Sequence, residues 1–284
     1  MRAWHPRHLI TLVAAAILTA CGGGGSSSPT THAPLPQVVS DTNPVGDRID
    51  LRSRNYFPAA ANDNWIYDHI QGDVTTRSGA TTLVRNVDAD TYTLSETVVG
   101  ETASTETYRR TSAGLVATDI TDGAVPAAAR TLIGEILMYP EPFFPAGTTR
   151  RIVRQGDWGA DEDGDGINES FRLEITQQLV GFESISLPRG DTETVHFRTV
   201  TALTLSPSSL ASTPHTITGT EETWWAPGVG LVQADRSAVD SSNATVVAPY
   251  RLKIVAGSVG NVSVAAPPPY IGSVEAHLPN YDLT

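Results

Sequence analysis

Apolar and polar residues alternate along many short segments of this chain, and this pattern restricts most of it to β-strands. In the segments 91–95, 171–176, 195–198 and 251–254, every second residue is large and apolar. A period of two places alternate side chains on opposite faces of a strand, so that one face packs and the other meets solvent. Gly, Asp, Asn and Pro lie between the segments, as turns require. The sequence predicts an all-β fold, with one or more twisted antiparallel sheets curled into a half-barrel or packed as a sandwich.

One stretch departs from the alternation. In 125–140, the apolar residues Leu132, Ile133, Ile136 and Leu137 recur at helical spacing after Pro126. Proline is favoured at a helix start, so we expect at most one short helix, and we expect it here.

Two parts of the chain resemble each other. Phe-Pro-Ala occurs at 57–59 and at 144–146, and each copy is followed later by a similar segment, TETYRRTSAGLVATD at 105–119 and TEETWWAPGVGLVQAD at 220–235. An internal duplication would produce two related sets of strands that share a core. The alternative is that Gly-Leu-Val after a turn is common in strands.

The N-terminus has the features of a secretory signal peptide over residues 1–20. Arg2 and Arg7 precede an apolar run from Leu9 to Ala20, which is shorter than the about 20 residues that a spanning helix needs. The run ends in Leu-Thr-Ala-Cys, which resembles the bacterial lipobox. That resemblance implies that Cys21, the only cysteine, becomes the acylated N-terminus, carrying lipid such as palmitate. Gly22 after the cysteine implies release to the outer membrane. The bland reading is a chance cysteine in an ordinary signal peptide.

Composition divides the rest of the chain into three parts. Residues 21–50 are rich in Gly, Ser, Thr and Pro and have few large apolar side chains, so we expect a flexible tether after the lipidated cysteine. Residues 51–264 carry the alternating segments and form the β-rich domain. Residues 265–284 begin with a proline run and are expected to be an extended tail.

The charge of the chain limits its partners. Without Arg2 and Arg7, 17 of the 19 basic residues remain against 31 acidic ones, which gives a net charge of −14. Such a chain is repelled by nucleic acid and by anionic lipid surfaces. The sequence leaves open whether a protein, a glycan or a lipid is the ligand.

The stretch GADEDGDGINES at 159–170 predicts a calcium loop. Asp161, Asp163 and Asp165 alternate, Ile167 can offer its carbonyl, and Glu169 can bind directly or through water. Gly166 permits the sharp turn. Calcium takes six to eight oxygen ligands, and this order resembles the first nine positions of an EF-hand loop and the loops of dockerins. We expect a structural calcium ion.

The calcium pattern is incomplete. Arg172 stands where an EF-hand has a bidentate glutamate, so Asp157, Glu174 or water would have to complete the shell. We therefore expect weak affinity, roughly 10⁻⁴ to 10⁻³ M. Strand-like segments flank the loop, which predicts that it joins two strands of a hairpin. The alternative is a solvated acidic turn without an ion.

Other motifs for chemistry are sparse. The histidines of the domain and tail, His69, His196, His215 and His277, have no metal-binding spacing, and no nucleophile elbow or phosphate loop occurs. We expect Trp65 and Tyr67 to share one face of a strand. Trp224 and Trp225 should lie on opposite faces of another, one in the core and one partly exposed.

Three segments together carry a wider resemblance. YFPAAANDNWIYD at 56–68, GFESISLPRGDTETVHFRT at 181–199 and ETWWAPGVGLVQAD at 222–235 resemble motifs of uncharacterised, exported, β-rich bacterial outer-membrane lipoproteins. The middle turn of the pattern corresponds to residues 188–190 here. The resemblance implies a twisted antiparallel sheet and no particular activity.

These observations favour a non-enzymatic, membrane-anchored lipoprotein of the bacterial envelope with a binding or structural role. One alternative is a carrier that holds a hydrophobic ligand in a curled sheet, which requires an apolar cavity of roughly several hundred Å³. The other is a hydrolase with an unmarked site, which requires a histidine, a carboxylate and a nucleophile within hydrogen-bond reach.

Overall fold

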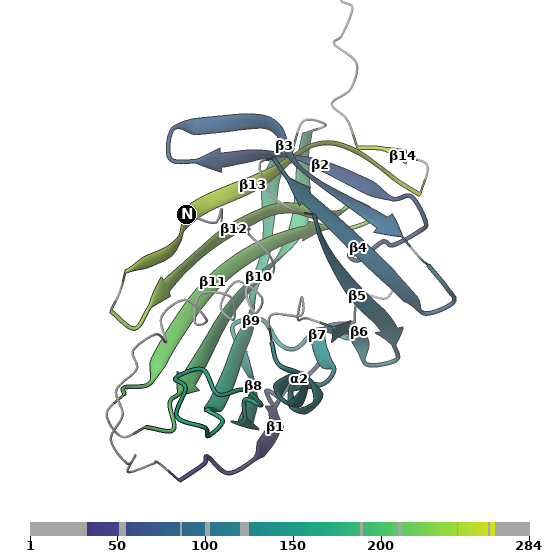
Figure 1. The fold of residues 1–284 in the computed structure, drawn as a ribbon. Helices are drawn as coiled ribbons and strands as arrows, with labels where there is room; N and C mark the ends of the chain where they lie inside the picture. The colour runs from purple at the N-terminus through teal and green to yellow at the C-terminus, as the bar shows by residue number, and fades with distance from the viewer. Residues whose placement is uncertain are drawn as a thin grey trace, which may run out of the picture.

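A computed structural model describes residues 33–50, 55–85, 87–99, 103–119, 125–187, 190–209, 212–242, 244–260 and 262–264. Over these residues, 14 strands form one antiparallel sheet (Figure 1). The predictions for the signal peptide, Cys21, the tail at 265–284 and the turn residues 188 and 189 lie outside the described residues. No helix within the described ranges is long and apolar enough to cross a membrane.

The strands lie between the turn segments that the sequence predicted. They are β1 (Val38–Thr42), β2 (Asn64–Gln71), β3 (Val74–Arg85), β4 (Thr91–Val98), β5 (Ser104–Thr111), β6 (Gly114–Asp119), β7 (Ile136–Pro140), β8 (Thr149–Asp157), β9 (Ser170–Leu187), β10 (Gly190–Ser206), β11 (His215–Ala226), β12 (Gly230–Asp240), β13 (Thr245–Val259) and β14 (Val262–Ser263).

Alternation sets the two faces of the sheet, as predicted. In the first half of β9, buried Phe171, Leu173 and Ile175 alternate with half-buried polar residues. In β13, Leu252 and Ile254 are buried in the same way. The buried faces of all these strands join one continuous core. The predicted all-β, antiparallel fold is confirmed, as a single sheet rather than a sandwich.

The sheet order brings distant parts of the chain together. The strands run β1-β8-β9-β10-β11-β12-β13-β2-β3-β4-β5-β6-β7, and β14 pairs with β13 outside this path. Two six-strand meanders, β2 to β7 and β8 to β13, are therefore joined where β13 pairs with β2. The sheet twists strongly along this order, as the right-handed twist of strands dictates, and the two meanders come to face each other across the interior (Figure 1).

The two similar sequence segments occupy equivalent places in these meanders. Residues 105–119 lie in the β5–β6 hairpin, and residues 220–235 lie in the β11–β12 hairpin, each formed by the fourth and fifth strands of its meander. Gly114-Leu115-Val116 and Gly230-Leu231-Val232 each open the second strand. The second segment is one residue longer because three turn residues lie between the paired Ala226 and Gly230, whereas two lie between the paired Thr111 and Gly114.

The short helix is present but ends earlier than its apolar spacing suggests. It is α2 (Ala127–Ile133), with Ala129 and Ile133 buried. Gly134 follows at φ 61, a conformation that favours glycine and stops the helix. Ile136 and Leu137, which helical spacing placed on the same helix, instead belong to β7. That part of the prediction is wrong because the glycine separates them from the helix.

The segment expected to be a flexible tether up to residue 50 contains a strand. β1 pairs along its whole length with the edge of β8, and Ile49 forms an isolated bridge with Phe143. Backbone pairing at a sheet edge needs few apolar side chains, which is why composition does not indicate it. Asp41 of β1 also forms ion pairs with the buried guanidinium groups of Arg150 and Arg154, at 3.3 Å and 2.6 Å.

Candidate functional site

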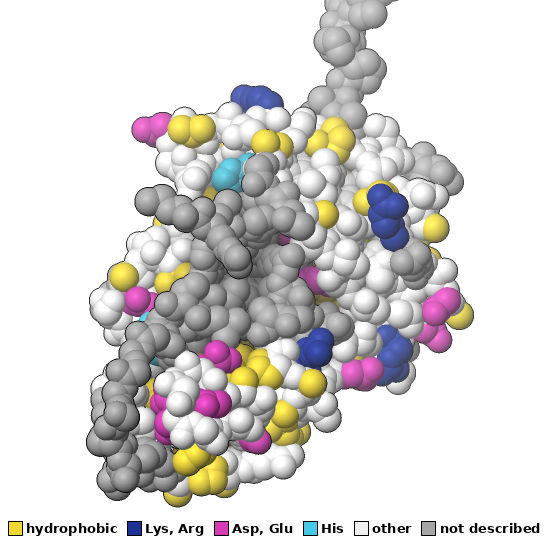
Figure 2. All heavy atoms as spheres, viewed as in Figure 1, with side chains coloured by type: hydrophobic (Ala, Val, Ile, Leu, Met, Phe, Trp, Pro, Cys, Tyr) yellow, Lys and Arg dark blue, Asp and Glu magenta, His cyan; other side chains and the backbone are white. Residues whose placement is uncertain are grey.

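The acidic loop joins β8 to β9 and is held firmly at its base. The Trp158 N–H donates to the carbonyl of Glu169 at 2.8 Å, and the Glu169 N–H donates to Ala160 at 3.1 Å. The Trp158 ring is fully buried, and its Nε1 donates to Glu162 Oε1 at 2.9 Å. Acidic side chains gather on the surface at this end of the sheet (Figure 2).

Asp161 curls the loop around its own carboxylate. Its Oδ1 accepts from the N–H groups of Gly164 and Asp165 at 2.7 Å and 3.1 Å, and its Oδ2 accepts from Gly166 at 2.8 Å. Gly164 and Gly166 have φ values of 80° and 85°, in the left-handed region that glycine adopts without strain. The predicted role of Gly166 in the turn is confirmed.

Three of the five predicted ligands converge. Asp161, Asp163 and Glu169 each offer a carboxylate oxygen, and these atoms lie within 4.8 Å of one another. Asp163 Oδ2 and Glu169 Oε1 are buried and have no hydrogen-bond partner, and Glu169 is only 1% exposed. Burial raises the pKa of the Glu169 carboxyl, and the charge of Asp163 raises it further. Converging carboxylates that include buried oxygens without a hydrogen-bond partner have the chemistry of a cation site.

The other two predicted ligands lie differently. Asp165 Oδ1 accepts from the Ile167 N–H at 2.9 Å, and its Oδ2 accepts from the Ser208 hydroxyl. Asp165 is not among the three carboxylates that converge, since Ser208 and the Ile167 N–H bind its oxygens, and its role as a ligand stays a prediction. The Ile167 side chain is exposed, and the use of its carbonyl as a ligand stays a prediction.

Arg172 does not compete with a cation in the loop. Its guanidinium donates to Gln155 Oε1 at 2.7 Å and pairs with Glu174 at 3.3 Å, both on the sheet. Glu174 is also bound by both arms of Arg151, at 2.6 Å and 2.7 Å. Glu174 therefore does not complete the ligand shell of an ion in the loop. Asp157 accepts a hydrogen bond from a backbone N–H of the loop.

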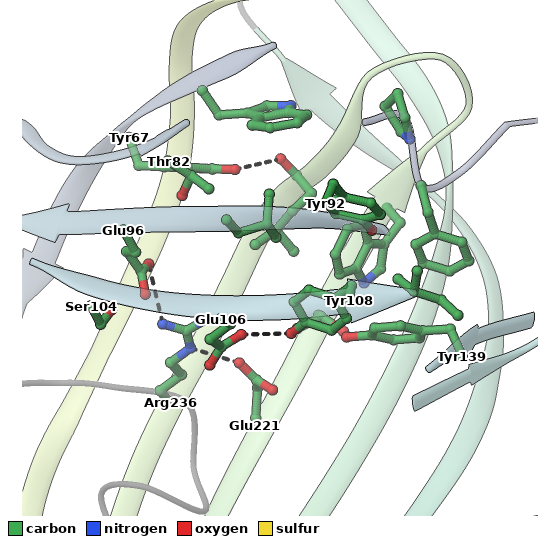
Figure 3. Close-up of a pocket in the computed structure, with 18 residues that line it drawn as sticks. Tyr67, Thr82, Tyr92, Glu96, Ser104, Glu106, Tyr108, Tyr139, Glu221 and Arg236 are labelled. Carbon is green, nitrogen blue, oxygen red and sulfur yellow. Dashed lines mark hydrogen bonds and ion pairs between the residues drawn. The ribbon is translucent and has the colours of Figure 1, made fainter. Parts of the chain in front are cut away.

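A second candidate site lies inside the curl of the sheet. Aromatic side chains from both meanders surround a partly enclosed cavity of about 60 Å³; they include Trp65, Tyr67, Tyr92, Tyr108, Tyr139 and Trp225 (Figure 3). Trp65 and Tyr67 are both buried on the same face of β2, as predicted. Trp224 and Trp225 lie on opposite faces, also as predicted, but both are half-buried rather than one being core.

Charged side chains form one wall of this cavity. Arg236 Nε donates to Glu221 Oε1 at 2.6 Å, and its Nη1 lies 3.5 Å from Glu96 Oε1 and 3.4 Å from the Tyr250 hydroxyl. Glu106 also lines the cavity and accepts from the Tyr108 hydroxyl at 2.6 Å (Figure 3). Three carboxylates and one guanidinium therefore line the cavity, and two of the carboxylates contact the guanidinium.

The environment fixes the protonation of this wall. Burial alone would lower the pKa of the Arg236 guanidinium, but Tyr250, Glu221 and Glu96 outweigh burial and raise it well above its ordinary value. Burial also raises the pKa of Tyr250, to about 12, and raises that of Tyr67 well above 10. At neutral pH the tyrosines are neutral hydrogen-bonding groups and Arg236 is charged.

Two polar atoms on the cavity wall lack partners. Glu96 Oε2 is a buried acceptor and Trp225 Nε1 is a buried donor, and neither has a hydrogen-bond partner. Buried polar groups are nearly always satisfied by protein, water or ligand. Something that both accepts and donates hydrogen bonds therefore fits this space.

The cavity is lined from both sides by the two similar hairpins. Glu106, Tyr108 and Leu115 from β5 and β6 correspond, in order along the segment, to Glu221, Thr223 and Leu231 from β11 and β12. All six residues line the cavity. The sequence resemblance between the hairpins thus has a structural counterpart, since both copies present a glutamate and a leucine to one space.

His196 lies on the outer face of the sheet, in a third cluster. Its Nδ1 and Nε2 contact Glu183 and Glu222 at 2.8 Å and 2.5 Å, and its ring stacks on Trp224 with centroids 4.3 Å apart. Both ring nitrogens of His196 therefore contact carboxylates, and neither nitrogen is directed at a hydroxyl nucleophile. His69 stacks on Tyr250.

Known proteins resemble this chain only distantly. No family profile and no curated protein matches it. Solved structures that align with it are a candidate lipoprotein from Parabacteroides distasonis (15% identity, TM-score 0.37, covering 71% of this chain and 97% of the other) and a candidate exported protein with a YmcC-like fold from Bacteroides fragilis (12%, 0.37, 71% and 97%). The hypothetical lipoprotein YmcC from Escherichia coli K12 aligns at 9% identity, with a TM-score of 0.28, over 68% of this chain and 83% of its own.

Sequence reasoning did not find the Glu96–Arg236–Glu221 cluster. Glu96 and Arg236 are 140 residues apart, and only the curl of the sheet brings them together. One signal was available. The repeated Thr-Glu near the start of both similar segments contains Glu106 and Glu221, so the repeat marked two of the residues that line the cavity.

Proposed function

We propose that this chain is a lipid-anchored, non-enzymatic lipoprotein of the bacterial outer membrane, whose β-sheet domain has a binding or structural role and is stiffened by one calcium ion. The anchor is supported by the signal-like N-terminus and by Cys21 at its lipobox position. Two or more acyl chains, at about 0.8 kcal/mol for each buried methylene, would hold the chain firmly.

The observation that carries the calcium proposal is the buried Glu169 Oε1, which has no hydrogen-bond partner and belongs to a carboxylate that converges with those of Asp161 and Asp163. These residues would hold the ion, and water or loop carbonyls would complete its shell. Calcium supplies charge neutralisation and cross-links the tip of the loop to its base. It is proposed as a structural element rather than a catalytic one.

The anchor is tested with Cys21→Ala. We expect the unmodified chain to incorporate a labelled fatty acid in cells and the variant to incorporate none, because acylation requires the thiol. The variant should accumulate as precursor or as soluble periplasmic protein. Equal label in both chains would refute the anchor.

The calcium site is tested with terbium, which binds calcium sites and emits when excited through a nearby indole. Trp158 is packed under the loop, so terbium bound there should luminesce on tryptophan excitation and calcium should displace it. The full-length chain in maltoside micelles is the sample. Glu169→Gln and Asp163→Asn should remove the signal.

The matched control for these variants is Asp165→Asn. This residue lies in the same loop, but its oxygens are taken by Ser208 and Ile167, so terbium luminescence should survive. Loss of signal in all three variants alike would mean nonspecific attraction to the acidic loop. No calcium-displaceable signal in the unmodified chain would leave the loop as a solvated acidic turn.

The observed cavity bears on the carrier alternative. A space of about 60 Å³ is well below the several hundred Å³ that a hydrophobic ligand needs, and its wall is charged. The hydrolase alternative has its best histidine in His196, whose ring nitrogens both contact carboxylates. Both observations favour a binding or structural role.

A further inference from the structure

The aromatic cavity inside the sheet has the chemical features of a ligand site, and these features are independent of the acidic loop. We propose that it binds the head group of a small organic ammonium compound, with the positive charge against Glu96 and the tyrosine and tryptophan rings around it. This deepens the binding role proposed above by naming the class of ligand.

The cavity wall carries more negative than positive charge. Glu96, Glu106 and Glu221 line the cavity and Arg236 is the single cationic side chain among its lining residues. Glu221 and Glu96 share that guanidinium, and Glu96 Oε2 is left buried without a partner. Glu96 is 8% exposed, so water reaches it poorly. A second cation beside Glu96 would complete the pairing.

Aromatic rings form much of the cavity wall. Tyr92 and Tyr108 stack with centroids 5.8 Å apart, and Trp225 meets Tyr139 edge-on at 5.1 Å. The faces of such rings attract cations, and methylated ammonium groups are commonly bound within several aromatic rings. Because burial keeps the Tyr92 and Tyr108 hydroxyls neutral, the rings do not themselves become anions at physiological pH.

The size of the cavity and the unpartnered polar atoms on its wall limit the ligand further. A volume of about 60 Å³ admits about four water-sized groups, which suits an ammonium head and not a fatty chain. The unpartnered Trp225 Nε1 can donate to a hydroxyl oxygen of the same ligand. An amino alcohol can therefore place its ammonium charge beside Glu96 and its hydroxyl oxygen against Trp225.

Choline and its uncharged carbon isostere dimethylbutanol provide the test. They have nearly the same shape and hydroxyl group and differ in charge. Binding to the full-length chain in maltoside micelles is measured by ligand-observed NMR. We expect choline to bind at least tenfold more tightly than the isostere. Only choline makes cation–π and ion-pair contacts, and in a desolvated cavity these contribute about 1.4 kcal/mol or more, which corresponds to a tenfold lower Kd.

Variants then locate the site. Glu96→Gln should weaken choline binding by about tenfold and leave isostere binding unchanged, while Trp225→Phe should weaken both ligands similarly. Glu222→Gln is the matched control, because this residue neighbours Glu221 on β11 but faces His196 on the other side of the sheet. It should bind choline normally.

Equal binding of choline and the isostere to the unmodified chain would overturn the proposal, and so would absence of choline binding. This comparison needs no variant, so a folding defect in Glu96→Gln cannot obscure it. Terbium luminescence and fatty-acid label use other residues. A failure of the cavity proposal is therefore distinguishable from a failure of the anchor or of the calcium site.

Discussion

The acidic loop and the cavity wall both gather carboxylates, but they neutralise them differently. In the cavity, Arg236 lies between Glu96 and Glu221 and is itself buried. In the loop, the described residues include no cationic side chain that pairs with Asp161, Asp163 or Glu169. Loop N–H groups satisfy Asp161, and the unpartnered oxygens belong to the other two residues.

The difference separates charges that are paired within the fold from charges that have no cationic partner among the described residues. A buried ion pair persists without any ligand, because removing either partner exposes the other to a large desolvation penalty. A cluster without an internal cation is stable only to the extent that solvent or an added ion screens it. We therefore expect Arg236 to affect folding at all times, and the loop to affect it according to the ion supplied.

The largest expected effect comes from Arg236→Met. The change leaves Glu96 and Glu221 buried without their cation and should lower the free energy of unfolding by about 3–5 kcal/mol. For a domain of this size the melting temperature should fall by roughly ten degrees or more, measured by circular dichroism on the full chain. Adding Glu221→Gln and Glu96→Gln to this variant should recover part of the loss. An unchanged melting temperature in Arg236→Met would contradict the stabilising role assigned to the ion pairs of Arg236 with Glu96 and Glu221.

High pH should affect the cavity more than the loop. The raised pKa of Tyr250, about 12 in the folded chain, means that its contribution to stability is complete below pH 10 and is lost as the pH rises from 10 to 12. At pH 11 the loss is about 1.4 kcal/mol for each such tyrosine. Tyrosinate absorbance and circular dichroism should change together. Full ionisation of the tyrosines in a chain that is still folded would contradict their burial.

Calcium removal should have a smaller effect. With calcium at about ten times its Kd, binding to the folded state alone contributes about 1.4 kcal/mol, or a rise of a few degrees in melting temperature. Magnesium should contribute less, because it demands a tighter octahedral shell. The melting temperature of Glu169→Gln should be insensitive to both calcium and chelator, and that of Asp165→Asn should still respond. A calcium response in Glu169→Gln would place the ion elsewhere.

The smallest effect is expected from Arg251→Met. Arg251 and Asp235 form a two-armed ion pair at 2.6 Å, but both are substantially exposed. Such pairs contribute about 0–1 kcal/mol. Comparing this variant with Arg236→Met by urea denaturation separates burial from pairing geometry. Equal losses in the two variants would mean that burial is not what makes Arg236 important.

Sequence patterns predicted the sheet because alternation is local, and it holds in segments such as the first half of β9 and the middle of β13. They predicted the helix only as far as Ile133, since apolar spacing does not register that Gly134 reverses the backbone. For the loop, spacing identified the carboxylates, but the hydrogen bond from Ser208 to Asp165 joins segments 43 residues apart. The cavity depends on how the sheet curls, which no local pattern specifies.

The edge strand β1 has a mechanical consequence. Tension applied at Ala33 reaches the hydrogen bonds of Leu35 and Pro36 with β9 and β8, and then β1, whose five residues pair with β8. Asp41 binds two guanidinium groups with exposures of only 2% and 6%, so peeling this strand away would strip buried charges of their counter-ion as well as break backbone hydrogen bonds. The domain thus has an electrostatic latch at the point where a pulling force enters it.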